Sequence, residues 1–412
     1  MNKTVRTTDD DEEVTLDFLM ALQPVYTRNL DVAAFELLLE DSVDKSSVDT
    51  NDLCKLILDT YGSIYQNGKV NVVPVFLEIS ESILLGTDSI DIPAKQYILE
   101  ITPKIKPTPE IIHTLRTLSS KGYRIALSDY QDDPVALKPL LEVIHIVKFD
   151  ITKLTPETIQ TYATEMKTQG LDLLVEGLVS QTQFRRCLEL GFHFFTGDFL
   201  QKPKKGNNKP IGNNKLLLLE LLTEIQNPDS DVARLESIAS RDPNLAYKLL
   251  RIINSAAFGF NREIDTLGHA INILGMEQLG RWVTLFLLEG NASQTQDLMR
   301  NMLVCGRMCE ILAELTGRDK VISHFIAGLL SQLDILMEIP MDDLMKQVPL
   351  NQEIKDALLH REGSIGEILT EAEHYEKGRF LELSGIVEKH FYEVVYRHST
   401  EWAKKIMSAM NH

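Results

Sequence analysis

The sequence has few basic residues relative to acidic ones, and this charge balance excludes several classes of partner. Its 42 lysines and arginines are outnumbered by 60 aspartates and glutamates, which gives a formal net charge of -18. Such an acidic chain repels nucleic acid and anionic lipid unless it carries a local basic patch. The dense basic run at residues 202–209 lies in a stretch with the composition of a linker. We therefore expect no nucleic-acid partner.

Cysteine is scarce, and its spacing does not indicate a metal centre. The chain has 4 cysteines, and Cys54, Cys187, Cys305 and Cys309 form no CxxC pair. Cys305 and Cys309 would share one helix face, but no histidine or further cysteine clusters with them. We predict reduced thiols in a reducing compartment rather than a zinc site.

Membrane and targeting signals are also missing from the sequence. Residues 9–13 are all acidic, the opposite of the basic start of a signal peptide. No uncharged apolar run approaches the ~18–20 residues that a membrane-spanning helix needs. We expect a cytoplasmic protein with no membrane contact, in which residues 1–14 form an acidic flexible tail.

Residues 15–203 alternate short apolar runs with amphipathic segments such as 109–119 and 181–190. The strand-like runs are Val32–Leu39, Val72–Ile79, Gln96–Ile101, Arg124–Asp129, His145–Phe149, Leu171–Val175 and Phe192–Phe195. Such alternation predicts βα units and a mainly parallel sheet. So many units in fewer than 200 residues favour a compact (β/α) barrel over an open sheet.

The pattern changes after this region. Residues 204–214 are rich in Gly, Asn and Lys, which predicts a linker. From residue 215 to 412, apolar residues recur at the three-to-four spacing of amphipathic helices. The fold class predicted is therefore α/β plus all-α, with a barrel at 15–203 followed by a helical domain at 215–412.

Charged side chains stand in or at the ends of the strand-like runs of the first domain. They are Glu36, Glu78, Glu100, Asp129, Lys148 and Glu176. Strand ends of a (β/α) barrel meet on one rim, where carboxylates would suit Mg²⁺ or Mn²⁺ and phosphodiester hydrolysis. The alternative is that these are ordinary strand ends running into charged loops.

Several motifs in the first domain resemble EAL domains, which hydrolyse cyclic di-GMP. These motifs are LQPVYTRNLDVAAFELLLE, YILEIT, RIALSDY, IVKFDITKL, VEGLVSQTQF and LGFHFFTGDFLQKP. They cover roughly residues 18–203 in the family's order and spacing, and the resemblance implies a modified TIM barrel.

The resemblance assigns roles to the charged residues one at a time. Glu36 and Glu100 match metal-binding glutamates, and Asp129 matches one aspartate of a metal-binding pair. Lys148 matches the lysine near the attacking water, and Glu176 matches the general base. Glu78 stands where the family has a metal-binding asparagine.

Other positions depart from the family pattern. Glu40 replaces an arginine that holds a ligand phosphate, and Ser128 replaces the first aspartate of the pair. Val179 and Thr196 replace a glutamate and a glutamine, and residues 130–134 lack the glycines of the family's loop. A two-metal mechanism needs both ions clamped, so these changes predict a degenerate site with poor turnover.

The second domain resembles HDOD domains, which are related to metal-dependent HD phosphohydrolases. The matching residues are Asp242, Pro243, Leu245, Leu249, Leu250, Asn254, Ser255, Ala270, Ile271, Leu274 and Gly275. Ser331 and Gln332 stand where the relatives have a His-Asp metal doublet, and neither is a good divalent ligand. We interpret His324 and His269 as ordinary histidines.

The combination favours a cyclic di-GMP-pathway signalling protein that acts through protein–protein contacts. No cofactor is expected, unless the barrel retains Mg²⁺ or Mn²⁺ at Glu36, Glu78, Glu100 and Asp129. Two alternatives stay open: a weak metal-dependent cyclic di-GMP phosphodiesterase that uses Glu176 and Lys148, and a nucleotide sensor without turnover. The sequence also leaves a homodimer open.

Overall fold

A computed structural model gives the fold. It describes residues 18–40, 63–66, 69–85, 92–130, 133–199, 213–225, 227, 229–242, 245–248, 250, 266–288, 296–337, 339–348 and 350–410. The predicted tail, most of the predicted linker, and Cys54, Asn254 and Ser255 lie outside these residues. Contacts divide the chain into two compact units, residues 1–201 with 374–412 and residues 202–373.

The first unit contains a closed barrel, which confirms the predicted α/β fold of this part of the chain. The strand order around the barrel is β1-β10-β9-β8-β7-β6-β5-β2. Strands β2 and β5 to β10 run parallel, and β1 is antiparallel to both of its neighbours. The strands are β1 (Met20–Thr27), β2 (Val32–Leu39), β5 (Val75–Glu78), β6 (Tyr97–Ile101), β7 (Arg124–Leu127), β8 (Ile146–Asp150), β9 (Asp172–Leu178) and β10 (Phe194–Gly197).

Most predicted strand runs coincide with observed strands, and the differences have local causes. Strand β2 matches its prediction residue for residue. Strand β7 ends at Leu127, two residues before the predicted end at Asp129. The Ser128 N–H still donates to the Ile101 carbonyl at 3.0 Å, but Asp129 adopts a positive φ of 47°, which ends the extended backbone. Residues 69–72 form β4, which pairs with β3 (Ser63–Gln66), and β5 begins only after Pro74.

Strand β1 is the one barrel strand that the sequence pattern did not predict. It reads MALQPVYT, and Pro24 in its middle argues against a strand because proline has no N–H for a ladder. The strand is nevertheless buried at Met20, Ala21 and Val25 and pairs with β2 along almost its whole length. Burial against β2 therefore outweighs the local signal of Pro24.

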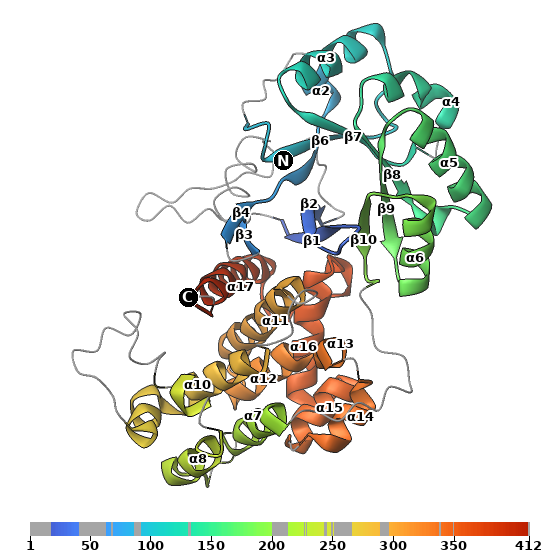
Figure 1. The fold of residues 1–412 in the computed structure, drawn as a ribbon. Coiled ribbons are helices and arrows are strands. Elements are labelled where there is room, and N and C mark those ends of the chain that lie inside the picture. Colours follow the sequence, from blue (N-terminus) through green and yellow to red (C-terminus); the bar gives the residue numbers. More distant parts are fainter. Residues whose placement is uncertain are drawn as a thin grey trace, which may run out of the picture. The chain divides into compact units, whose positions relative to one another are not determined.

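The main helices of the barrel are α3 (Pro109–Ser120), α5 (Pro156–Thr168) and α6 (Gln181–Leu190), which lie outside the strands in Figure 1. Each begins at a residue whose hydroxyl accepts a backbone N–H of the first turn. These N-caps are Thr108, Thr155 and Ser180. The α3 and α6 bounds match the predicted helical segments at 109–119 and 181–190.

The floor of the barrel interior is an apolar layer to which nearly every strand contributes. It consists of Val25, Ala34, Phe76, Ile98, Ala126, Ile146 and Leu174, with Phe194 packed against it. Alternate residues of a strand face the same side of a sheet. The side chains two positions farther along the parallel strands therefore form the next interior layer.

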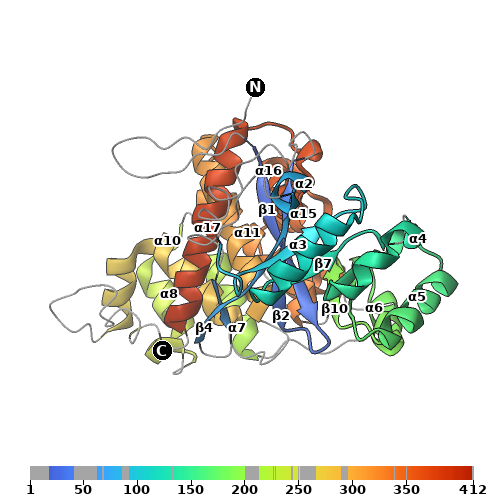
Figure 2. The same ribbon diagram turned by 90° about the horizontal axis from the view of Figure 1, so that it is seen from above.

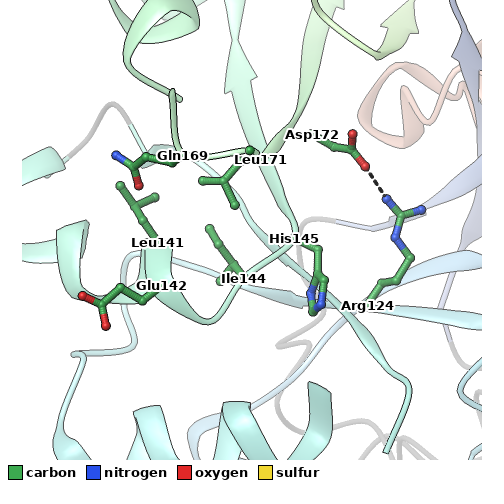
Figure 3. A pocket seen from close by; sticks show the side chains of 9 residues that line it. Arg124, Leu141, Glu142, Ile144, His145, Gln169, Leu171 and Asp172 are labelled. Atoms are coloured by element: carbon green, nitrogen blue, oxygen red, sulfur yellow. Dashed lines mark hydrogen bonds and ion pairs between the residues drawn. The ribbon is translucent and has the colours of Figure 1, made fainter. Parts of the chain in front are cut away.

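Strands β7, β8 and β9 also border a pocket at their amino-terminal ends, shown in Figure 3. Its volume is about 480 Å³, and Arg124 on its wall forms a 2.8 Å ion pair with Asp172. His145 Nδ1 accepts the Ile125 N–H at 3.1 Å, and His145 Nε2 lies 3.3 Å from Ser119 Oγ. In a (β/α) barrel this end usually serves stability, because chemistry is built at the carboxyl ends of the strands.

His145 makes the stability of the barrel depend on pH. Partial burial and the Arg124 guanidinium lower its pKa from 6.5, and its Nδ1 can accept the Ile125 N–H only while unprotonated. The unfolded chain therefore takes up the proton first, so this contribution is complete above pH 6.5 and is lost as the pH falls below it. We expect His145→Asn, whose amide oxygen can replace Nδ1, to flatten the fall in melting temperature between pH 7 and 5. His113→Asn, an exposed position on α3, is the control, and equal pH slopes for His145→Asn and wild type would contradict the assignment.

Within the residues described for it, the second unit consists of helices joined by turns, which confirms the predicted all-α half. Gly275, with φ of 71°, interrupts α10 as only glycine does at low cost. A Cβ on Gly328 would lie 2.7 Å from the Cys305 carbonyl oxygen, so glycine is needed where α11 and α12 meet. The helices are α7 (Asn213–Ile225), α8 (Val232–Ala239), α10 (Leu267–Leu288), α11 (Gln296–Leu315), α12 (Val321–Leu330), α13 (Leu333–Met337), α14 (Met341–Gln347) and α15 (Gln352–His360).

The last part of the chain belongs by its contacts to the barrel unit. Helix α16 (Gly363–Glu376) ends there, and α17 (Lys389–Met410) packs against β1 and β3 (Figures 1 and 2). The domain limits predicted from the sequence, 15–203 and 215–412, stay a prediction. None of the helices within the described residues has the length and apolarity to cross a membrane.

Candidate functional site

A polar layer lies directly above the apolar floor of the barrel. Each member follows a floor residue by two positions along the chain, so it faces the same interior. They are Glu36, Glu78, Glu100, Ser128, Lys148, Glu176 and Thr196. The layer therefore lies toward the carboxyl ends of the parallel strands, where (β/α) barrels build their active sites.

The ammonium of Lys148 is the centre of this layer. Its Nζ lies 2.6 Å from Glu36 Oε1, 2.9 Å from Glu100 Oε2 and 2.7 Å from Glu176 Oε1. The lysine side chain is 5% exposed, and Nζ stands 5.0 Å from the centre of the Phe76 ring. Three strands distant in the chain, β2, β6 and β9, thus meet at one cation from β8.

The electrostatics of the cluster fix the charge of its lysine. Burial by itself would lower the pKa of Lys148, but Glu100, Glu176 and Glu36 together raise it well above 10.5. Burial, followed by the charge of Glu36, raises the pKa of Glu176 well above 4.5, although Lys148 opposes the shift. The cluster is therefore a permanent cation surrounded by carboxylates, one of which binds a proton more readily than usual.

Glu78, Ser128 and Asp129 have other surroundings. Glu78 stands beside Glu100 in the β5–β6 ladder. The Ser128 hydroxyl donates a 3.2 Å hydrogen bond to the Ile101 carbonyl, and the residue is buried. Asp129 forms a 2.9 Å ion pair with Lys153, which also lies 3.8 Å from Asp150. Of the predicted site residues, Glu36, Glu100, Lys148 and Glu176 are thus brought together, and Asp129 belongs to a separate ion pair.

The remaining predicted barrel positions lie apart from the cluster's ion pairs. Glu40 is buried and forms an ion pair with Lys389 of α17, which nothing in the sequence signals. Val179 is 56% exposed. Thr196 is buried in the polar layer, and its hydroxyl has no hydrogen-bond partner among the described residues. A Cβ at Gly197 would lie 2.3 Å from the Leu178 carbonyl oxygen, so only glycine fits after Thr196.

The donor chemistry suits a hard divalent cation, but the arrangement does not hold one as it stands. Glu36 Oε1 and Glu176 Oε1 are buried oxygens that accept no aligned hydrogen bond within the described chain, so they attract positive charge. The Lys148 ammonium balances one of the three carboxylate charges and lies within 2.9 Å of an oxygen of each, so it occupies the space between them. In the residues that the structure describes, no group of three His, Cys, Asp or Glu is placed to bind a metal.

In the helical unit, Ser331 and Gln332 stand where the sequence resemblance expects a His-Asp metal doublet, and Ser331 bonds to the backbone of its own helix. The Ser331 hydroxyl donates to the Gly328 carbonyl at 2.7 Å, which ends α12, and Gln332 is half-buried beside it. His324 is buried, with Nδ1 3.2 Å from the Lys320 carbonyl and Nε2 3.4 Å from Ser364 Oγ. Burial lowers the pKa of His324, so the ring is neutral at pH 7.

The Lys148 cluster makes a stability prediction. Removing a buried ammonium leaves three carboxylates facing one another, which costs about 3–5 kcal/mol by comparison with broken buried ion pairs. We expect Lys148→Met to lose that much stability to urea at pH 7. Because protonation relieves carboxylate repulsion and the folded pKa of Glu176 lies above 4.5, the deficit should shrink as the pH falls toward 5.

The matched control is Lys153→Met, since Lys153 pairs with Asp129 but is 48% exposed. Its cost should stay below about 1 kcal/mol, as for other exposed pairs. Equal urea midpoints for Lys148→Met and wild type at pH 7 would show that the cluster is not held by its lysine.

Two family models match the chain on either side of the predicted linker. The model of the EAL domain matches residues 78–203, and that of the HDOD domain matches residues 215–399. Glu36 precedes the EAL match, whereas Glu78, Glu100, Lys148 and Glu176 lie within it. The HDOD match extends into the segment 374–399, which contacts group with the barrel.

Two relatives align with this chain over most of their own length. The uncharacterized protein YuxH of Bacillus subtilis is 25% identical over 405 residues, 95% of this chain and 99% of its own. The cyclic di-GMP phosphodiesterase CdgJ of Vibrio cholerae is 26% identical over 377 residues, 89% of this chain and 86% of its own. Among solved structures, an EAL domain protein from Listeria monocytogenes aligns over 45% of this chain and 87% of that one, with 15% identity and a TM-score of 0.34.

Proposed function

Since the chain joins an EAL domain to an HDOD domain, we propose that it is a cyclic di-GMP-pathway signalling protein whose barrel does not turn the nucleotide over efficiently. Signalling would then proceed through contacts with protein partners. The name of the relative CdgJ supports the pathway, and the interior of the barrel supports the lack of turnover.

The observation that carries this proposal is the position of Lys148 among Glu36, Glu100 and Glu176. The cation is buried and paired on three sides, so the three carboxylates contact the lysine rather than a ligand. The residue that follows β7 supplies no carboxylate to the site, because it is Ser128, whose hydroxyl donates to the Ile101 carbonyl. A site that clamps two metal ions needs carboxylates at both places.

The expected loss of rate follows from the electrostatics. Removing one preorganised partner of the reacting charge costs about 10²–10³ in rate in well-studied enzymes. Replacement of an aspartate by Ser128, of a glutamate by Val179 and of a cationic phosphate contact by Glu40 removes several at once. Their combined effect supports a barrel that is retained as a scaffold.

A direct assay tests this proposal. Purified full-length protein is incubated with cyclic di-GMP and Mn²⁺ at alkaline pH, and linear product is measured by chromatography. We expect no product above the protein-free reaction. Product that forms with the wild type, persists in the exposed-site control Glu142→Gln and vanishes in Glu176→Gln would overturn the proposal.

The second candidate is weak metal-dependent phosphodiesterase activity, and the raised pKa of Glu176 favours it. A carboxylate with such a pKa is a better general base near neutral pH than an ordinary glutamate. Because a base acts in its deprotonated form, the rate would rise with pH through that pKa and then level off. A pH–rate profile without this rise would exclude Glu176 as the base.

A further inference from the structure

Strand β1 has an incompletely paired edge in the barrel. It pairs with β2 from Met20 to Tyr26, but with β10 only Tyr26 and Thr27 are in register, opposite Phe195 and Phe194. The backbone of Met20 and Leu22 is buried, so its polar groups need partners other than water.

Two tyrosines from the last part of the chain supply those partners. The Tyr375 hydroxyl donates to the Met20 carbonyl at 2.7 Å and accepts the Met20 N–H at 3.4 Å. The Tyr396 hydroxyl accepts the Leu22 N–H at 3.3 Å. A helix end and a second helix thus supply hydrogen-bond partners to the part of β1 that lies beyond its pairing with β10.

An ion pair anchors the same segment to the neighbouring strand. Glu40 follows β2 and is 6% exposed, and its carboxylate binds Lys389 at the start of α17. The Glu40 backbone N–H donates to the Leu19 carbonyl at 3.0 Å, which fixes it to the start of β1. Gly378 also packs against Leu38 so closely that a Cβ there would lie 2.6 Å from Leu38 Cδ1.

Aromatic packing makes this segment rigid. Tyr375 stacks on Tyr392 with ring centres 6.0 Å apart and contacts Phe380 at 5.2 Å and Tyr396 at 5.2 Å. The hydroxyls that reach β1 are therefore held in place before they bind. Phenol rings fixed in this way hold their hydroxyl groups in position, in addition to burying apolar area.

We propose that residues 374–410, here called the C-terminal clamp, hold β1 and β2 and thereby position Glu36 against Lys148. Glu36 lies on β2 opposite Gln23 of β1, next to the anchored end of the pair, where Leu22 stands opposite Leu37. Tyr375, Lys389 and Tyr396 are positioning residues that act through these strands. Glu40, at the position where the resemblance expects a phosphate-binding arginine, is then the anchor of the clamp.

The clamp couples the two sequence domains. Residues 374–399 lie within the HDOD match but fold with the barrel, so the end of the HDOD sequence completes the EAL barrel. A partner that displaces this segment would loosen β1–β2 and change the Lys148 cluster. The regulation of the barrel site would thus be built into the chain, whether or not the barrel has turnover.

A charge swap in the full-length protein tests the clamp. Glu40→Arg and Lys389→Glu each place like charges together, whereas the double variant restores an ion pair of reversed polarity. Amide hydrogen exchange is measured by mass spectrometry over residues 19–26 and 33–39. We expect each single variant to exchange there about 10-fold faster or more, which is about 1.4 kcal/mol of lost protection, and the double variant to return toward wild type.

Controls keep the outcome specific to the clamp. Lys405→Glu, an exposed position farther along α17, should leave both segments unchanged. If a charge variant does not fold, Lys389→Met combined with Tyr396→Phe removes the ammonium and the hydroxyl while keeping side chains of similar size, and it should accelerate exchange in the same segments. Unchanged exchange in the variants, or no rescue by the swap, would overturn the clamp. Hydrogen exchange needs no ligand, so this result is independent of the phosphodiesterase assay.

Discussion

The structure of the barrel depends on one buried charge, the Lys148 ammonium, and the carboxylates gathered around it. Taking these ions out of water is costly, and the cost is offset only when the partners are close and of opposite sign. Glu36, Glu100 and Glu176 come from β2, β6 and β9, so closing the barrel and pairing the lysine are one event. Without this ion pairing, the polar layer above the apolar floor would be the least stable part of the barrel interior.

The sequence predicts the barrel well where the pattern is local. Strand β2 and helices α3 and α6 follow from alternation, capping residues and proline at the helix start, all visible within a few positions. The polar layer is also visible, because the two-residue period places Glu100 above Ile98 and Glu176 above Leu174. Strand β1 is not predicted, because Pro24 weakens the local strand pattern. The burial of β1 comes from its pairing with β2, which the local pattern does not show.

The pairing of the site residues could not be predicted in the same way. Asp129 looked like a member of the central set, yet its left-handed backbone turns it toward Lys153. Glu40 looked like a repulsive charge near a ligand, but Lys389, 349 residues away, is its partner. Contacts at such separation leave no periodicity or spacing in the sequence, and a single charge that seems misplaced is their only trace.

The charge balance around the polar layer bears on how the protein signals. A cyclic dinucleotide carries two negative phosphates and needs cations that are available to it. Lys148 is shared by three carboxylates, Lys153 by Asp129 and Asp150, and Lys389 is bound to Glu40. A nucleotide that took up Lys148 would leave the largely buried carboxylates around it without their cation, which is strongly unfavourable. A protein partner that displaces the C-terminal clamp breaks the Glu40–Lys389 pair directly but not the three contacts of Lys148, and this difference favours protein contacts in the function proposed above.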